Sequence, residues 1–228
     1  MLRPEPGASA TAARAKAMGL EPVLAPLFTI RPIAWEAPDP ASLDAILLTS
    51  ANAAREAGPR LAAYLHLPCR TVGEATAAAA EAAGFADVRT GPGDGAAALA
   101  AMSGRVLHLC GREHLPLTHD GVNVQRRIVY SADAVAWLPA AAHHALGAGA
   151  IALLHSPRAA ATFASFLPED ARAGVTAAAI SAAAAAALGP GWRRVAVAAR
   201  PRDEALLELA AELCQKSQAL KSEDGHGL

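Results

Sequence analysis

Two stretches of this sequence decide the fold. Residues 45–54 read A-I-L-L-T-S-A-N-A-A, and residues 150–160 read A-I-A-L-L-H-S-P-R-A-A. In each, a short apolar run typical of a buried strand ends at a serine, and an alanine-rich helical pattern follows. This self-similarity predicts two copies of one strand-to-helix unit. Chance matching is the alternative, because alanine is abundant throughout the chain.

A second pair of similar stretches supports the prediction of a repeat. The stretch T-V-G-E-A-T-A-A-A-A begins at Thr71 and A-I-S-A-A-A-A-A-A begins at Ala179; each then reaches a glycine and an aromatic residue. Short apolar runs alternate with helical patterns along the whole chain, which is the signature of an α/β fold. We expect strands at 22–25, 45–48, 70–72, 87–89, 105–109, 122–129, 150–154, 176–180 and 194–198, and helices at 8–18, 51–64, 75–83, 94–102, 113–119, 157–167, 182–188 and 202–215.

Two extended segments interrupt this alternation. The stretch from Pro26 to Pro40 is broken by prolines, and residues 130–139 form a second connector. If the residues between them make one complete unit, the two ends of the chain must combine to make the other. The sequence thus predicts two similar doubly wound parallel-sheet domains, one inserted in the other and joined by a two-stranded linker that permits hinge motion. The expected boundaries are 1–28 plus 138–215 for the outer domain, 40–128 for the inserted domain, 29–39 and 129–137 for the linker, and 216–228 for a frayed tail.

Composition excludes several classes of protein. The net charge is −1 and aromatic residues make up 4% of the chain, so a nucleic-acid surface is not expected. The apolar stretch 173–188 is too short to cross a membrane, and the N-terminus lacks the apolar core of a signal peptide. Three widely spaced cysteines read as reduced thiols. We therefore expect a cytoplasmic protein with no membrane partner.

Hydroxyl residues at the starts of helices are the first candidates for ligand binding. Ser50 and Ser156 each follow a strand and precede a helix, where unpaired backbone N–H groups favour anions. Each hydroxyl has two possible roles, because it can also cap its own helix. The stretch Gly73 to Thr76 offers a similar helix start, and its counterpart has a hydroxyl at Ser181. Ligands of open α/β sheets bind at these carboxyl ends of strands.

Other motifs narrow the chemistry. Gly111 and Arg112 end another strand, and Arg112 is either a surface charge or a cation aimed at a ligand. The chain contains no phosphate-binding loop, no dinucleotide fingerprint and no G-x-S-x-G elbow. Tyr130 lies where the chain leaves the inserted domain, as either a hinge-packing residue or a proton donor. Four residues match no zinc pattern and predict no metal site: His108, Cys110, His114 and His119.

Taken together, these residues resemble the uroporphyrinogen-III synthase family over nearly the whole chain, to about Leu213. Each motif is weak alone, but six in order at fitting spacings are fairly specific. The segments that carry the resemblance are Arg3 to Ala8 with Thr11-Ala12, Leu47 to Ala53, Val72 to Ala77, Leu109 to Arg112, Val129-Tyr130, and His155 to Ala160.

The resemblance implies a lyase that closes linear hydroxymethylbilane into uroporphyrinogen III in tetrapyrrole biosynthesis, inverting the last pyrrole ring and losing water. It implies no cofactor and no metal; hydroxymethylbilane is the expected partner, and we expect a monomer. In the family the general acid is commonly proposed to be the linker tyrosine, here Tyr130. The expected substrate-binding residues are Arg3, Thr49, Ser50, Ala51, Gly73, Thr76, Gly111, Arg112, His155, Ser156, Arg158 and Ser181.

The sequence departs from the family in two places. The first strand is reduced to Met1-Leu2, and a threonine pair often found in the outer domain is replaced by Ala183-Ala184. The second departure puts substrate contacts from that loop in doubt. The alternative function is a non-catalytic two-domain protein that binds a polyanionic metabolite, because a fold by itself does not fix function. A degenerate scaffold paralogue is a third possibility.

Overall fold

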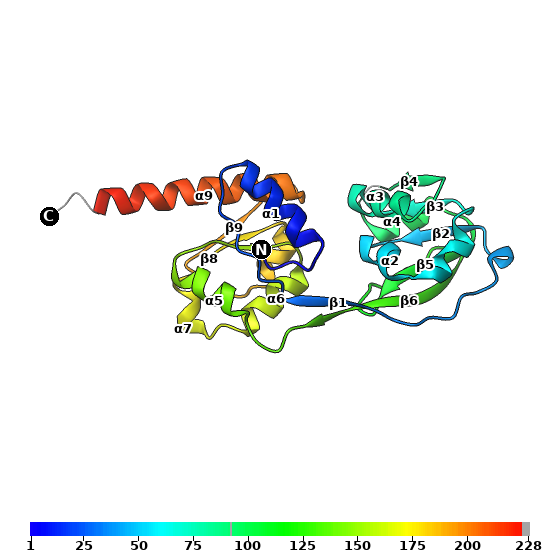
Figure 1. Cartoon of the computed structure of the whole chain (residues 1–228), viewed down its shortest axis with the longest axis horizontal. Helices are drawn as coiled ribbons and strands as arrows, with labels where there is room; N and C mark the ends of the chain where they lie inside the picture. The colour runs from blue at the N-terminus through cyan, green and yellow to red at the C-terminus, as the bar shows by residue number, and fades with distance from the viewer. Residues whose placement is uncertain (92, 225–228) are drawn as a thin grey trace. The chain divides into compact units, whose positions relative to one another are not determined.

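The computed structural model describes residues 1–91 and 93–224, with side chains to residue 216. It is a mixed α/β protein of parallel sheets and helices (Figure 1). Its contacts divide the chain into two compact units. Unit 1 comprises Met1–Thr29 and Ala134–Leu228, and unit 2 comprises Ile30–Asp133.

The sheet of unit 2 reverses its direction of growth at its centre. Its strand order is β1-β6-β5-β2-β3-β4, and the pairs from β6 to β4 are all parallel. From β2 the chain builds β3 and β4 on one side, then crosses to the other side for β5 and β6. The carboxyl ends of β2 and β5 therefore meet at the switch point where such folds bind ligands. The strands are β1 (Phe28–Pro32), β2 (Ala45–Leu48), β3 (Cys69–Thr71), β4 (Val88–Thr90), β5 (Gly104–Gly111) and β6 (Val122–Ala134).

Alternating side chains of these strands fill two cores. Ile46, Leu48 and Leu109 pack with the alanines of α2 and α3 on one face, whereas Leu47 packs with Leu99 of α4 on the other. This alternation is the period of two expected of strands buried on both faces. The helices of unit 2 are α2 (Ala51–Glu56), α3 (Glu74–Ala82) and α4 (Gly95–Ala100), with 3-10 turns η1 (Pro40–Ser42) and η2 (Pro59–Tyr64).

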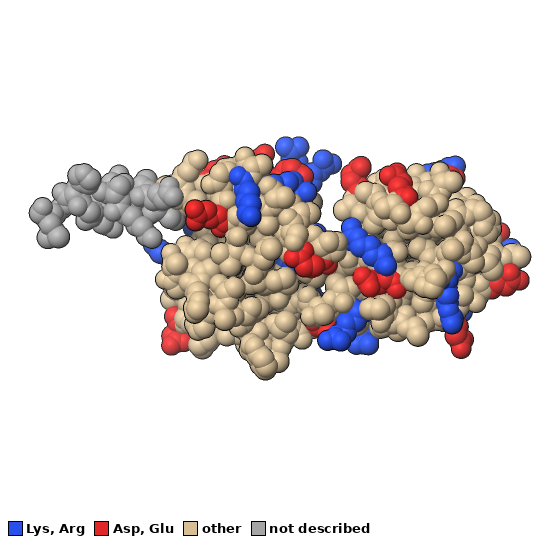
Figure 2. Space-filling model, viewed as in Figure 1, with Lys and Arg blue, Asp and Glu red and all other residues tan. Residues whose placement is uncertain are grey.

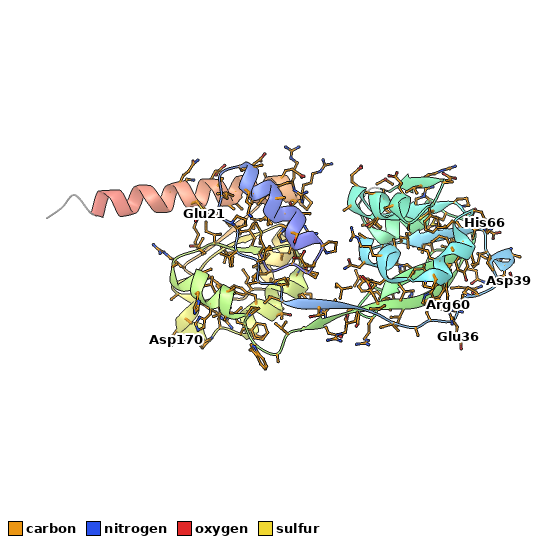
Figure 3. The ribbon with its side chains drawn as sticks, viewed as in Figure 1. Glu21, Glu36, Asp39, Arg60, His66 and Asp170 are labelled. Carbon is orange, nitrogen blue, oxygen red and sulfur yellow. The ribbon has the colours of Figure 1, made fainter. Side chains whose placement is uncertain are left out.

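Part of the first connector lies in the interior of unit 2. Trp35 is only 7% exposed, and its ring centroid lies 6.0 Å from that of Tyr64. The indole N–H of Trp35 donates to the carbonyl of Ala57 at 2.8 Å, and the Tyr64 hydroxyl donates to the carbonyl of Pro38 at 2.6 Å. Arg60, labelled in Figure 3, donates to the carbonyl of Trp35. These bonds fix an otherwise irregular segment to the core.

Unit 1 holds a smaller parallel sheet with the order β7-β8-β9. Its strands are short and rich in alanine, so larger side chains such as Leu153, Leu206 and Phe163 supply much of the buried apolar area. The strands are β7 (Ala152–Leu154), β8 (Thr176–Ala179) and β9 (Arg194–Val197), and the helices are α1 (Gly7–Ala17), α5 (Ala140–Gly147), α6 (Pro157–Ser165), α7 (Glu169–Arg172), α8 (Ala182–Ala186) and α9 (Asp203–Asp224).

Three predicted elements differ from the structure for identifiable reasons. The helix expected over 51–64 breaks at Gly58, whose φ of 69° is left-handed, and the following Pro59 has no N–H to donate. The helix expected over 113–119 is absent, because Pro116 disfavours helical conformation at the residue before it. The strand expected at 22–25 is also absent; Val23 and Ala25 in this segment form backbone hydrogen bonds with Met1 at the start of the chain.

Two elements extend beyond their expected ends, and two helices lie where none was expected. Strand β6 continues to Ala134, five residues past its expected end, through part of the second connector. Helices α5 and α7 were not expected. Helix α9 continues through Asp224 into the expected frayed tail, whose last residues, 225–228, lie outside the described part of the chain.

Charges of both signs are mixed on the surface. On the face that Figure 2 shows, lysine and arginine side chains are interspersed with aspartate and glutamate among neutral residues. None of the helices in the described part of the chain combines the length and apolar character needed to cross a membrane.

The anchoring of the connector can be tested by truncating its tryptophan. Trp35→Ala should lower the free energy of unfolding by about 3–5 kcal/mol, because it leaves a cavity in the core. Tyr64→Phe should cost about 1 kcal/mol, the value of one hydrogen bond. Trp137 is 76% exposed, so Trp137→Ala should change stability by less than about 0.5 kcal/mol. Urea unfolding followed by circular dichroism measures all three, and equal midpoints for Trp35→Ala and Trp137→Ala would contradict the packing described above.

Candidate functional site

Ser50 is the centre of a hydrogen-bonded group at the carboxyl edge of the unit 2 sheet. It follows β2 and caps α2, with its hydroxyl oxygen accepting from the backbone N–H of Asn52 at 3.2 Å. The same oxygen accepts from the hydroxyl of Tyr130, on β6, at 3.0 Å. The fold thus brings together two residues that are 80 positions apart in the sequence. Because the oxygen of Ser50 accepts twice, its own hydrogen is left to donate to a ligand.

The lack of a side chain at Gly111 leaves room for the ring of Tyr130. A Cβ atom built on Gly111 would lie 2.6 Å from Cζ of Tyr130 and 2.9 Å from its hydroxyl oxygen. The glycine is required by this close approach and not by a left-handed backbone. Tyr130 is half-buried, and it also packs against the apolar core below it. Its hydroxyl bonds within its own unit, so the residue combines a packing role with a polar group at the sheet edge.

Thr49, the residue before Ser50, bonds to a buried histidine. Its hydroxyl oxygen lies 3.0 Å from Nε2 of His108, which is 1% exposed. Burial is the main cause that lowers the pKa of His108 to about 4, with smaller contributions from the nearby Arg126 and His114, so the ring is neutral near pH 7. The rings of His108 and His114 meet edge to face at 6.4 Å between centroids.

The helix start after β3 also lies at this edge. Gly73 caps α3 in an extended conformation, and a Cβ atom there would meet nothing within 4 Å. Thr76 is only 6% exposed, so its side chain points into unit 2. Ala51 is the first residue of α2 and is half-buried. Gly73 and Ala51 therefore offer backbone N–H groups, whereas the hydroxyl of Thr76 is turned away from solvent.

Arg112 follows β5 and is held from the neighbouring strand. Its backbone N–H donates to the carbonyl of Tyr130 at 2.8 Å, and its guanidinium lies 3.3 Å from the carboxylate of Asp133. Arg31 reaches the same carboxylate at 3.6 Å. Because all three side chains are well exposed, these ion pairs contribute little to stability. They do place two cations beside one carboxylate at the end of β6.

In unit 1, the predicted serines cap their helices. Ser156 accepts from the backbone N–H of Ala159 at 3.1 Å at the start of α6, and Ser181 accepts from Ala184 at 3.2 Å at the start of α8. Both follow parallel strands, so they lie at the carboxyl edge of this sheet. Arg158 is exposed on α6, with its guanidinium carbon 4.6 Å from the ring centroid of Phe28. Capping accounts for the position of each serine and leaves its hydrogen free to donate.

Four polar side chains of unit 1 converge on the carboxylate of Asp203. Its carboxylate accepts from His155 at 2.8 Å, Thr11 at 2.9 Å and Arg14 at 2.9 Å, and Arg3 lies 3.4 Å away. Burial alone would raise the pKa of Asp203, but these hydrogen bonds outweigh it and hold the pKa well below its usual range. The carboxylate is therefore charged at all ordinary pH values. Arg3 and His155, both predicted to bind substrate, are thus engaged with an acidic group of the same chain.

His155 is neutral in this cluster. Its side chain is 7% exposed, and burial lowers its pKa in spite of the hydrogen bond to Asp203. The hydrogen on Nε2 points at the carboxylate, and Nδ1 is buried with no partner among the described residues. A neutral ring bonded to a charged carboxylate is a positioning contact, and its remaining N–H hydrogen is not acidic near pH 7.

Asp203 and His108 are central to these networks, but neither was predicted as a site residue. Asp203 follows the last strand and begins the last helix, a place that the carboxyl-end rule could have indicated. His108 is the one polar residue in the run V-L-H-L of β5, and a histidine inside an apolar run signals a buried partner. The sequence carries no signal that this partner is Thr49, which follows a different strand. Within the described ranges, no group of three or more histidine, cysteine or acidic residues is placed to hold a metal ion.

The contact between Gly111 and Tyr130 is testable against a second glycine. Gly111→Ala should displace the tyrosine ring and lower the free energy of unfolding by about 1–3 kcal/mol, as overpacked sites do. Gly73→Ala places the same methyl group in open space on extended backbone, so its only expected cost is the weaker N-capping of alanine, below about 1 kcal/mol. Urea unfolding compares the two variants. An equal loss of stability in both would show that the tyrosine does not depend on Gly111.

Comparison with solved structures identifies similar folds. A uroporphyrinogen-III synthetase from Helicobacter pylori matches with a TM-score of 0.60 and 22% identity, covering 82% of this chain and 91% of the other. A mutant uroporphyrinogen III synthase from Thermus thermophilus matches with a TM-score of 0.54 and 19% identity, covering 94% of this chain and 100% of the other. At these identities the likeness establishes the fold. Comparison with curated protein sequences gave no significant match.

The family follows from the sequence model that the chain matches. A model described as uroporphyrinogen-III synthase HemD matches residues 9–208, which include Ser50, Gly111, Tyr130 and Ser156. The match spans both units and every strand of the two sheets. This chain belongs to the uroporphyrinogen-III synthase family.

Proposed function

We infer that this protein is a cyclising lyase of tetrapyrrole biosynthesis that converts hydroxymethylbilane to uroporphyrinogen III. The observation that carries this conclusion is the family match over residues 9–208. Family membership favours the enzyme over a non-catalytic binding protein. The contacts at the carboxyl edges of the sheets then indicate how individual residues serve the reaction.

Binding is the first task, because the substrate carries eight carboxylates. Ser50, Ser156 and Ser181 each accept a hydrogen bond from their own helix and keep a hydrogen to donate. Each also lies where backbone N–H groups and the helix dipole favour an anion. We propose that these three helix starts bind substrate carboxylates, with the exposed Arg112 and Arg158 providing charge. Thr76 is a weaker candidate, because its side chain is buried.

Loss of water is the chemical step that needs a proton. The hydroxyl on the terminal pyrrole leaves as water only if its oxygen is protonated, and departure creates an azafulvene cation. The hydroxyl of Tyr130 is a donor of suitable type at the carboxyl edge, fixed by Gly111 and bonded to Ser50. We propose that the substrate hydroxyl replaces Ser50 as the acceptor of this hydrogen. Tyr130 then acts as the general acid.

Ring closure is mainly a matter of positioning. The last pyrrole ring must attack the cation through its substituted carbon, whereas free substrate closes without inversion. An enzyme that holds the substrate in one conformation allows closure with inversion and prevents closure without it. Many carboxylate contacts spread over two units are suited to this purpose, and we expect most single substitutions at binding residues to have moderate effects.

The unit 1 cluster has a defined part in this scheme. Arg3 forms an ion pair with Asp203, so a substrate carboxylate that binds Arg3 must compete with the carboxylate of Asp203. His155 is buried and bonded to the same carboxylate, so we assign it to holding Asp203 and Arg3 in place. The direct contact that we had expected from His155 is replaced by this indirect role.

The organisation of the chain completes the proposal. We propose two related α/β domains, residues 1–28 plus 138–215 and residues 40–128, one inserted in the other, with hinge motion at residues 29–39 and 129–137. A monomer in the cytoplasm that needs no cofactor is consistent with this chemistry. Small-angle scattering with and without a porphyrin ligand tests the hinge.

The activity itself is tested by product analysis. The protein is incubated with hydroxymethylbilane generated enzymatically, and the uroporphyrin isomers are separated after oxidation. Isomer III should predominate, because spontaneous closure without inversion gives isomer I. A product mixture identical to that of the sample without protein would overturn the proposed function and favour the binding-protein alternative.

The role of Tyr130 is tested by removing its hydroxyl alone. Tyr130→Phe should lower kcat, at the low end of the ~10²–10⁴-fold range of general acids because water can substitute, while the fold is kept. The matched control is Tyr64→Phe, which removes the other tyrosine hydroxyl from a bond to Pro38 away from this edge. That control should leave kcat unchanged. If Tyr130→Phe raises only KM, the phenol positions the substrate and is not the acid.

A further inference from the structure

We propose that His108 is a positioning residue that turns the hydroxyl of Thr49 outward as a hydrogen-bond donor to a substrate carboxylate. The inference rests on the proposed function for the identity of the ligand. It rests on the contacts of unit 2 for the orientation of the hydroxyl. His108 itself touches no substrate in this scheme, because it is 1% exposed.

Parallel pairing places the two side chains together. His108 lies on β5 directly opposite Leu47 of β2, and Thr49 follows two residues later on the same face. Nε2 of the histidine and the hydroxyl oxygen of Thr49 are 3.0 Å apart. The threonine is half-buried at the carboxyl end of β2, next to Ser50. The buried ring of His108 therefore contacts Thr49 from the interior of unit 2.

The hydrogen of the imidazole can be placed by elimination. The ring is neutral, so it carries one hydrogen, either on Nδ1 or on Nε2. Nδ1 is buried with no hydrogen-bond partner in the described part of the chain. A buried N–H without an acceptor is rarer and more costly than an acceptor without a donor. The hydrogen is therefore on Nε2 and is donated to the oxygen of Thr49.

The direction of this bond decides what Thr49 can do. An oxygen that accepts from His108 keeps its own hydrogen for a different partner. With the opposite tautomer, the hydroxyl would donate inward and present only an acceptor to the ligand, which a carboxylate cannot use. Burial, followed by the nearby Arg126 and His114, keeps the ring of His108 neutral. The direction of the bond to Thr49 is then set by the tautomer, with the hydrogen on Nε2.

The methyl group of Thr49 is fixed from the other side. Gly95, the first residue of α4, has no side chain; a Cβ atom there would lie 3.3 Å from the threonine methyl carbon and 2.9 Å from Leu117. The first turn of α4 therefore closes over the methyl group. The proximity of α4 to its methyl group and the bond from its hydroxyl oxygen to His108 restrict the rotation of the Thr49 side chain, and its hydroxyl hydrogen is left for a ligand.

Four variants separate this role from simple packing. His108→Phe fills the space but donates nothing, whereas His108→Gln places an amide N–H near the position of Nε2. Thr49→Val removes the hydroxyl at equal volume, and the fourth variant combines Thr49→Val with His108→Phe. Binding of uroporphyrin I, an octacarboxylate, is measured by fluorescence titration, and KM and kcat are measured with hydroxymethylbilane. Circular dichroism and urea unfolding report whether each variant folds.

The expected pattern is a loss of binding that is shared by the two residues. His108→Phe and Thr49→Val should each weaken porphyrin binding and raise KM by about 3- to 10-fold, the effect of one hydrogen bond, with kcat within about twofold. The double variant should be no worse than Thr49→Val alone, and His108→Gln should bind nearly as well as the wild type. Additive losses, or an equal loss in His108→Gln, would overturn the proposal.

A second measurement is independent of activity. Nitrogen-15 NMR of the histidine rings in the free protein should find the hydrogen of His108 on Nε2, and a hydrogen on Nδ1 would overturn the proposal outright. Absence of isomer III with the wild-type protein would instead overturn the proposed function. In that case, shared losses in porphyrin binding would still support the oriented hydroxyl, and unchanged binding in both single variants would refute it.

Discussion

The parallel pairing of β2 with β5 is the constraint on which the candidate site depends. It places the carboxyl ends of both strands side by side, so that Ser50 after β2 and Gly111 at the end of β5 open onto the same edge. Strand β6 then pairs with β5 and brings Tyr130 over Gly111. A shift of one residue in either pairing would turn these side chains to the opposite face. The apolar residues on both faces of β2 resist such a shift, since all three of Ile46, Leu47 and Leu48 are fully buried.

Both units use the same physical device at their helix starts. A serine accepts from its own helix, which stabilises the helix and at the same time leaves a hydrogen to donate. Capping and ligand binding are therefore compatible roles. The units differ in what surrounds the serine. Unit 2 places the phenol of Tyr130 on Ser50, whereas unit 1 gathers Arg3 and His155 around the charged carboxylate of Asp203.

Much of the local structure could be predicted, because hydrophobic periodicity and helix-start residues are encoded locally. The strands around 45–48, 105–109 and 176–180 were found within a few residues, and the helix starts at Ser50, Ser156 and Ser181 follow from the same signals. Two of the failures are local conflicts between an expected helix and residues that break a helical backbone. Gly58 with Pro59 divides one expected helix, and Pro116 prevents another.

The sequence by itself determined the α/β class, the repeat of the strand-to-helix unit and the family to which the chain belongs. It also placed the hydroxyls at helix starts, because capping needs only neighbouring residues. Tertiary structure alone decided which polar groups meet. The contacts of Tyr130 with Ser50, of His108 with Thr49 and of Asp203 with its four partners join residues 48 to 200 positions apart. Such contacts are fixed by strand order and register, which depend on how whole elements pack and not on any local pattern.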